Sequence, residues 1–82
     1  MLRQLTIDEV QPGDTITATR DGSEFIKLIV LGIPVKGRFE THVLYADNKS
    51  NLKQGETYKF FKKHFEGWQL SSNSEWRVER YV

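Results

Sequence analysis

Apolar and polar residues alternate with a period of two along most of this chain, and this pattern predicts β-strands. Residues 14–20 place threonines on one face and Ile16 and Ala18 on the other, as in a half-buried strand. Residues 24–31 carry apolar side chains on both faces, which predicts a central strand. Further strands are expected at residues 39–45, 57–65, 68–70 and 76–82. The chain is therefore predicted to be all-β.

Turn residues separate these segments and predict short connections. Pro12-Gly13 leads into the first strand, and Asp21-Gly22 is a strong signal for a two-residue hairpin. Thr6 and Glu9 have the spacing of a capping box, which predicts a short helical turn near the N-terminus. An open sheet this small would expose edge strands with unpaired backbone groups, which favour aggregation. We therefore expect a five-stranded β-barrel, half-open or closed, whose core includes Leu28, Val30, Val43 and Phe60.

Composition limits the size and setting of the protein. With 82 residues, 38% of them hydrophobic, the chain fits one domain over residues 1–82 with one modest core. It has no cysteine, which excludes disulfides and thiolate metal sites and makes a cytoplasmic setting the default expectation. The most apolar run, residues 28–35, is far shorter than the roughly 20 residues of a membrane helix. No signal-peptide pattern is present, so we expect neither export nor membrane anchoring.

Aromatic and basic residues interleave in the segment YKFFKKHFEGW, residues 58–68. Aromatic rings stack on nucleobases and lysines neutralise phosphates, so this mixture is typical of single-stranded nucleic-acid binding. A small β-domain also needs aromatics for its core, which is the competing interpretation. Residues 1–26 hold two basic and five acidic residues, a net charge of −3, whereas residues 27–82 carry +4. This asymmetry is compatible with a positive face for an anionic partner.

The order of these features resembles the oligonucleotide/oligosaccharide-binding (OB) fold. The resemblance covers Val10 to Val82: a Pro-Gly-Asp turn, an Asp-Gly hairpin, three meander strands, a linker, and a Leu-x-x-Gly-x-x-Tyr-x-Phe strand at residues 52–60. Residues 46–52 are short for the helix that often joins strands three and four of that fold, so a different small barrel stays open.

The resemblance implies a binding face on the second and third strands and the adjoining loops. The residues that it marks as nucleic-acid-binding candidates are Lys27, Lys36, Arg38, Phe39, His42, Tyr45, Lys62, Lys63, Phe65 and Trp68. Phe25, Phe39 and Phe61 fit a core role better than a surface role. Of Trp68 and Trp76, either one offers an exposed stacking surface or both cap the ends of the barrel.

Catalysis is not expected. Glu40 and His42, like His64 and Glu66, pair a carboxylate with a histidine, but a catalytic site needs several groups converging in a pocket. No zinc or phosphate-loop spacing occurs, so no metal and no cofactor are predicted. The sequence favours binding of single-stranded DNA or RNA with little sequence preference. The alternative is a small protein-binding accessory or inhibitor module of the kind that phages and mobile elements encode.

Overall fold

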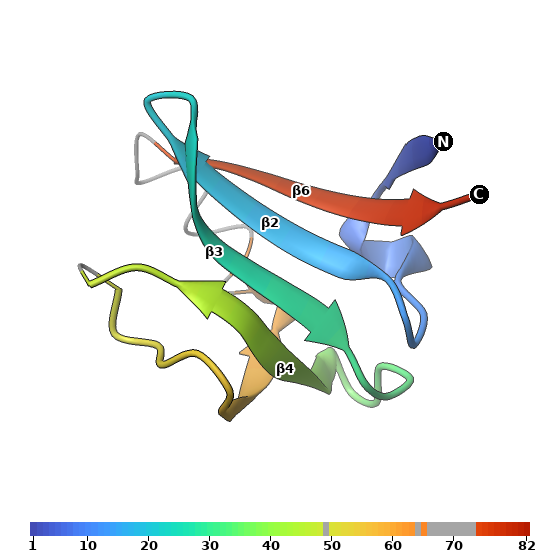
Figure 1. The fold of residues 1–82 in the computed structure, drawn as a ribbon. Helices are drawn as coiled ribbons and strands as arrows, with labels where there is room; N and C mark the ends of the chain where they lie inside the picture. Colours follow the sequence, from blue (N-terminus) through green and yellow to red (C-terminus); the bar gives the residue numbers. More distant parts are fainter. Residues whose placement is uncertain (49, 64, 66–73) are drawn as a thin grey trace.

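The computed structural model describes residues 1–48, 50–63, 65 and 74–82, and this part of the chain is all-β. Six antiparallel strands form one sheet in the order β1-β6-β2-β3-β4-β5 (Figure 1). The strands are β1 (Leu2–Leu5), β2 (Thr15–Arg20), β3 (Ser23–Val30), β4 (Arg38–Ala46), β5 (Thr57–Phe61) and β6 (Ser74–Tyr81). Among the described residues, helical backbone is limited to the 3-10 turn η1 (Ile7–Glu9), Lys62, Lys63 and Phe65. No helix in this part of the chain has the length and hydrophobicity that a membrane crossing requires.

Several local predictions are confirmed. The strand at residues 24–31 is β3, which is central because it pairs with β2 on one side and β4 on the other. The hairpin at Asp21-Gly22 joins β2 to β3 with φ angles of 54° and 81°, the left-handed values of a type I′ turn. The capped turn is η1, where the backbone N–H and the hydroxyl of Thr6 both donate to the Glu9 carboxylate, at 3.0 and 3.1 Å.

The closed, five-stranded form of the predicted barrel is wrong. The sheet has six strands, and it curls without closing (Figure 1). The additional strand is β1, which the alternation pattern did not reveal, and it pairs with β6. It therefore occupies the edge that closure onto β5 would have used. The predicted strand at residues 57–65 is also too long, since β5 ends at Phe61, and residues 68–70 lie outside the described part of the chain.

The hydrophobic core fills the inside of this curl. Leu28, Val30, Val43 and Phe60 are buried as predicted, each with an exposed fraction of 1% or less. Trp76 of β6 is buried too, and its ring centroid lies 6.2 Å from that of Phe60 on β5. Because β5 and β6 are far apart in the strand order, this contact shows that the sheet folds over its own core. Trp76 is therefore a core residue and offers no surface on which a base can stack.

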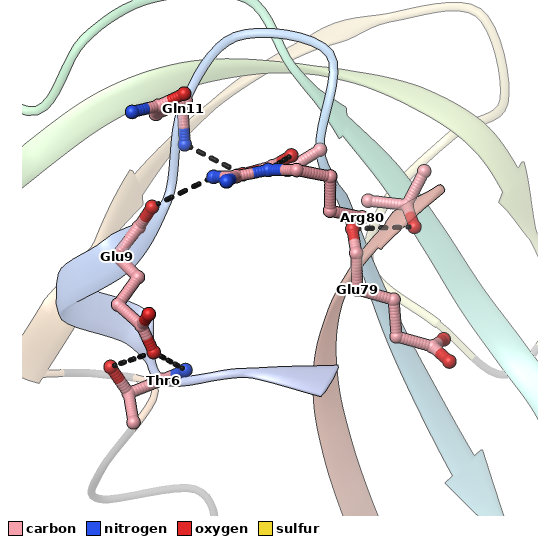
Figure 2. A network of polar contacts seen from close by, with 7 residues as sticks. Thr6, Glu9, Gln11, Glu79 and Arg80 are labelled. Atoms are coloured by element: carbon pink, nitrogen blue, oxygen red, sulfur yellow. Dashed lines mark hydrogen bonds and ion pairs between the residues drawn. The ribbon is translucent and has the colours of Figure 1, made fainter. Parts of the chain in front are cut away.

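An ion pair between a buried carboxylate and a half-buried guanidinium joins the N-terminal turns to the last strand (Figure 2). The Arg80 guanidinium on β6 donates to both oxygens of Asp14, with Nε to Oδ1 at 2.8 Å and Nη2 to Oδ2 at 2.9 Å. Arg80 Nη2 also donates to the carbonyl oxygen of Glu9 at 3.1 Å, and the backbone N–H of Gln11 donates to Asp14 at 2.8 Å. This bidentate geometry is the strong form of a charged hydrogen bond. It holds η1 and the turn that follows against the end of the sheet.

Candidate functional site

The register of β3 and β4 shows which of the candidate residues face solvent. Phe39, Thr41 and Val43 of β4 point into the core, so Arg38 and His42 lie on the opposite face. Tyr45 would return to the core side by simple alternation. A bulge at this point of the β3–β4 pairing changes that, because Lys27 pairs with Tyr45 while the next residue, Leu28, pairs with Val43. Tyr45 is 42% exposed as a result and lies beside Lys27.

Four basic side chains meet around one groove at the start of β4, which we call the cationic groove. It has a volume of about 540 Å³ and is lined by Lys36, Gly37, Arg38, Phe61, Lys62 and Lys63. Arg38 and Phe61 are partners in the β4–β5 pairing, and the backbone N–H of Lys62 donates to the Gly37 carbonyl at 2.9 Å. These contacts bring two segments, more than twenty residues apart in sequence, to one place.

The end of β5 explains why both lysines reach the groove. In a regular strand, Lys62 and Lys63 would point to opposite faces of the sheet. Instead the strand stops at Phe61, and Lys62 and Lys63 have helical backbone. Neighbouring residues in a helix are about 100° apart around its axis rather than 180°. Both cations therefore line the same groove.

A tight turn places the other two cations. Val35 and Arg38 exchange two backbone hydrogen bonds, at 2.8 and 3.2 Å, around the tip formed by Lys36 and Gly37. Lys36 has a φ of 55° and Gly37 a φ of 73°, which is the left-handed geometry of a type I′ hairpin. Glycine adopts this conformation freely, but for lysine it costs on the order of 1–2 kcal/mol. The turn thus holds a lysine at its tip where asparagine or glycine would be more stable.

Most of the charge in the cationic groove has no ion-pair partner among the described residues. Lys62 Nζ lies 2.9 Å from Oδ1 of Asp8, whose side chain is 80% exposed. An ion pair this exposed contributes little, typically below 1 kcal/mol, and an added anion can compete with it. For Lys36, Arg38 and Lys63, the structure shows no ion pair with any described residue. Within the described part of the chain, the groove is therefore a positive surface on which three cations have no competing carboxylate.

The remaining candidates lie elsewhere. Phe39 and Phe65 are core residues, 3% and 6% exposed, so neither is accessible for base stacking. Their apolar rings fill the inside of the curl, which outweighs the surface role that the resemblance implied. Trp68 lies outside the described residues, as does His64.

Exposed Tyr45 and half-buried Lys27 form a second group on the solvent face. They lie near the end of β4, whereas Arg38 begins that strand, so roughly 23 Å of extended backbone separates Tyr45 from the cationic groove. His42 lies between them on the same face and is half-buried. The candidates thus define a basic groove at one end of the solvent face and an aromatic-basic pair at the other.

The described groups whose pKa is shifted lie outside the cationic groove. The pKa of Asp14 is lowered, chiefly by its hydrogen bonds from Arg80, and that of Glu9 by hydrogen bonds from Thr6. Burial raises the pKa of Tyr58. None of these three groups lines the cationic groove. Among the residues that the structure describes, no three His, Cys, Asp or Glu side chains gather as metal ligands.

The loop between β3 and β4 lies where Gly32-Ile33-Pro34 and Lys36-Gly37 predict an interruption of the apolar run, and β3 ends at Val30. Leu31, Ile33 and Val35 are 50%, 74% and 60% exposed. The loop itself was predictable, because Gly32 and Pro34 interrupt a strand, but the exposure of these three apolar side chains was not. This apolar loop leads directly into the turn that carries Lys36.

No protein-family model, no curated protein and no solved structure matches this chain. The site is consequently interpreted from its own geometry. Its defining features are the cationic groove, the Lys27–Tyr45 pair on the solvent face and the exposed apolar loop.

Proposed function

We propose that this protein binds single-stranded nucleic acid, with the cationic groove as its phosphate contact. The observation that carries the proposal is the convergence of Lys36, Arg38, Lys62 and Lys63 on one groove, where only Lys62 has an ion-pair partner among the described residues. Neutralisation of phosphates by such cations supplies most of the affinity of non-specific nucleic-acid binding. Because phosphate contacts carry no sequence information, the proposal implies little sequence preference in this part of the interface.

The solvent face of β3 and β4 gives the ligand a path beyond the groove. Tyr45 is exposed for stacking at the far end of β4, with Lys27 beside it. Half-open barrels of the OB type use such a face and engage about 4–16 nucleotides, depending on the protein. The curled sheet is the part of that resemblance on which the proposal relies. Replacing Tyr45 by alanine is expected to weaken single-strand binding by roughly 1–3 kcal/mol.

The direct test is a titration of labelled single-stranded DNA, single-stranded RNA and duplex DNA at several salt concentrations. We expect the single strands to bind more tightly than the duplex, with an affinity that falls steeply with salt. The double variant Arg38→Gln/Lys63→Gln should reduce the slope of log affinity against log salt by about 2, one unit for each lost phosphate contact. Lys53→Gln is the matched control, since Lys53 lies in the exposed loop at the other end of the β4–β5 hairpin.

One observation favours the alternative of a protein-binding module. The exposed side chains of Leu31, Ile33 and Val35 form the kind of apolar surface on which protein partners dock. An interface built on such anchors depends much less on salt than a phosphate contact does. Absence of binding to every oligonucleotide at low salt would refute the nucleic-acid proposal and leave this alternative.

A further inference from the structure

A second groove adjoins the cationic groove, and we call it the loop groove. It has a volume of about 600 Å³ and lies between η1 with the turn after it and the apolar loop that follows β3. Its lining includes Asp8, Gln11, Pro12, Ile33, Pro34 and Lys62. Lys62 also lines the cationic groove, so the two grooves meet at this side chain. A ligand with a phosphate in one groove therefore has its next chemical group within reach of the other.

One wall of the loop groove is apolar. Ile33 is 74% exposed, and the prolines at positions 12 and 34 add flat aliphatic surface without a backbone donor. Exposed apolar side chains gathered beside a polar rim mark a binding surface. Nucleobases are planar groups that gain from contact with such surfaces when they are unstacked, as apolar wedges in nucleic-acid-binding proteins show.

The other wall offers hydrogen-bond acceptors. Oδ1 of Asp8 accepts a hydrogen bond from Lys62, and Oε1 of Glu9 accepts from Thr6. Among the described residues, no partner is shown for the second oxygen of either carboxylate. The side chain of Gln11 points away from the Arg80 network (Figure 2). Carboxylates accept hydrogen bonds from the exocyclic amino group of cytosine. They repel the carbonyl oxygens that thymine and uracil present at the same position.

We propose that the loop groove is a subsite for a nucleobase that carries an exocyclic amino group. The base packs on Ile33 and the prolines, its amino group donates to the second carboxylate oxygen of Asp8, and its phosphate lies in the cationic groove. This inference rests on the proposed function and adds a base preference to it: cytosine over thymine. The backbone contacts are indifferent to sequence, so the preference is expected at this one position.

The test uses three single strands of equal length: oligo-dC, oligo-dT and a chain of abasic sites. The wild-type protein should bind the abasic chain through the cationic groove and bind oligo-dC roughly tenfold more tightly than oligo-dT. Ile33→Ser should bring the affinity for oligo-dC close to that for oligo-dT, while both stay above that for the abasic chain because stacking on Tyr45 remains. Asp8→Asn should raise the affinity for all three, because it frees Lys62, and should bring the dC/dT ratio close to one.

Two variants serve as matched controls. Leu44→Ser removes an exposed apolar side chain from β4, and Glu56→Gln removes an exposed acid from the loop before β5. Neither should change the dC/dT ratio. Ile33 is exposed, so Ile33→Ser should keep the wild-type unfolding midpoint, and retention of abasic-chain binding will show directly that the variant is folded.

The outcomes separate the two proposals. If the wild-type protein binds none of the three strands, the proposed function fails and the base subsite with it. If it binds oligo-dT as tightly as oligo-dC, or the abasic chain as tightly as either, the phosphate groove stands and the base subsite is refuted. Vesicles containing phosphatidylserine form a fourth arm, because apolar loops beside cations also suit anionic membranes. Vesicle binding that depends on Ile33, with unchanged oligonucleotide binding, would likewise overturn the inference.

Discussion

The two charged regions beside η1 use their charges in opposite ways. At the Asp14–Arg80 pair, the carboxylate is 3% exposed and receives bonds from Arg80 and the Gln11 backbone (Figure 2). In the cationic groove, Lys36, Arg38 and Lys63 have no ion pair among the described residues. Burial and pairing therefore go together: a charge that stabilises the fold is paired, and a surface charge without a partner is available to a ligand.

The largest expected effect on stability comes from removing the Asp14–Arg80 ion pair. Asp14→Asn should lower the free energy of unfolding by about 2–4 kcal/mol, because it removes the charge of a buried carboxylate from a bidentate pair. Denaturant unfolding at neutral pH measures this loss. The matched control is Asp8→Asn, which removes one side of an exposed pair and should change stability by less than about 0.5 kcal/mol. Equal effects of the two substitutions would contradict the comparison.

The pH dependence of the free energy of unfolding should show the contribution of the Asp14–Arg80 pair. The pKa of Asp14 is lowered from its ordinary value of 3.8, chiefly by the hydrogen bonds from Arg80. A lowered folded-state pKa gives stability that is fully present above the unfolded-state value and is lost as the pH falls through the folded-state value. The stability difference between wild type and Asp14→Asn should therefore shrink below about pH 3.8. A difference that stays constant into acid would show that Asp14 is not the titrating group.

Much of the fold could be predicted from the sequence because alternation reports which face of a strand is buried. Thr17 is an exception to this rule. It lies on the other face of β2 from Ile16 and Ala18 and is still only 1% exposed. β1 escaped prediction because three of its four residues are exposed and its sequence does not alternate. Alternation carries no information on which strands become neighbours at the edges, so the sheet closure could not be decided from it.

The candidate site was predictable in composition but not in geometry. Arg38, Lys62 and Lys63 were identified from charge, yet their meeting depends on where β5 stops and helical backbone begins. Phe39 and Phe65 were assigned to the binding face by resemblance, and burial in the core decided otherwise. The exposure of Tyr45 depends on a bulge, a one-residue shift in pairing that period-two alternation does not anticipate.

Substitution of Arg38 and Lys63 in the cationic groove should weaken ligand binding and leave the stability of the fold nearly unchanged. Arg38→Gln/Lys63→Gln is expected to leave the free energy of unfolding within about 0.5 kcal/mol of wild type, because both side chains are exposed and unpaired among the described residues. Single-strand binding should weaken in the same preparation. Denaturant unfolding and the salt titration, run side by side, measure both. A clear loss of stability would mean that these cations support the fold.

The smallest effect on stability is expected from a substitution at Lys36, where backbone strain and ligand binding can be tested together. Its φ of 55° is unfavourable for lysine, whereas asparagine before glycine is the preferred pair for a type I′ turn. Lys36→Asn should therefore raise the free energy of unfolding by about 0.5 kcal/mol, a typical gain from a substitution suited to its backbone conformation. It should also reduce the salt slope of single-strand binding by about 1, because one phosphate contact is lost.

Lys53→Gln, which removes a lysine without relieving a strained φ, controls for the charge change. Higher stability with weaker binding would show that the turn accepts strain to place a cation in the groove, whereas higher stability with unchanged binding would remove Lys36 from the site.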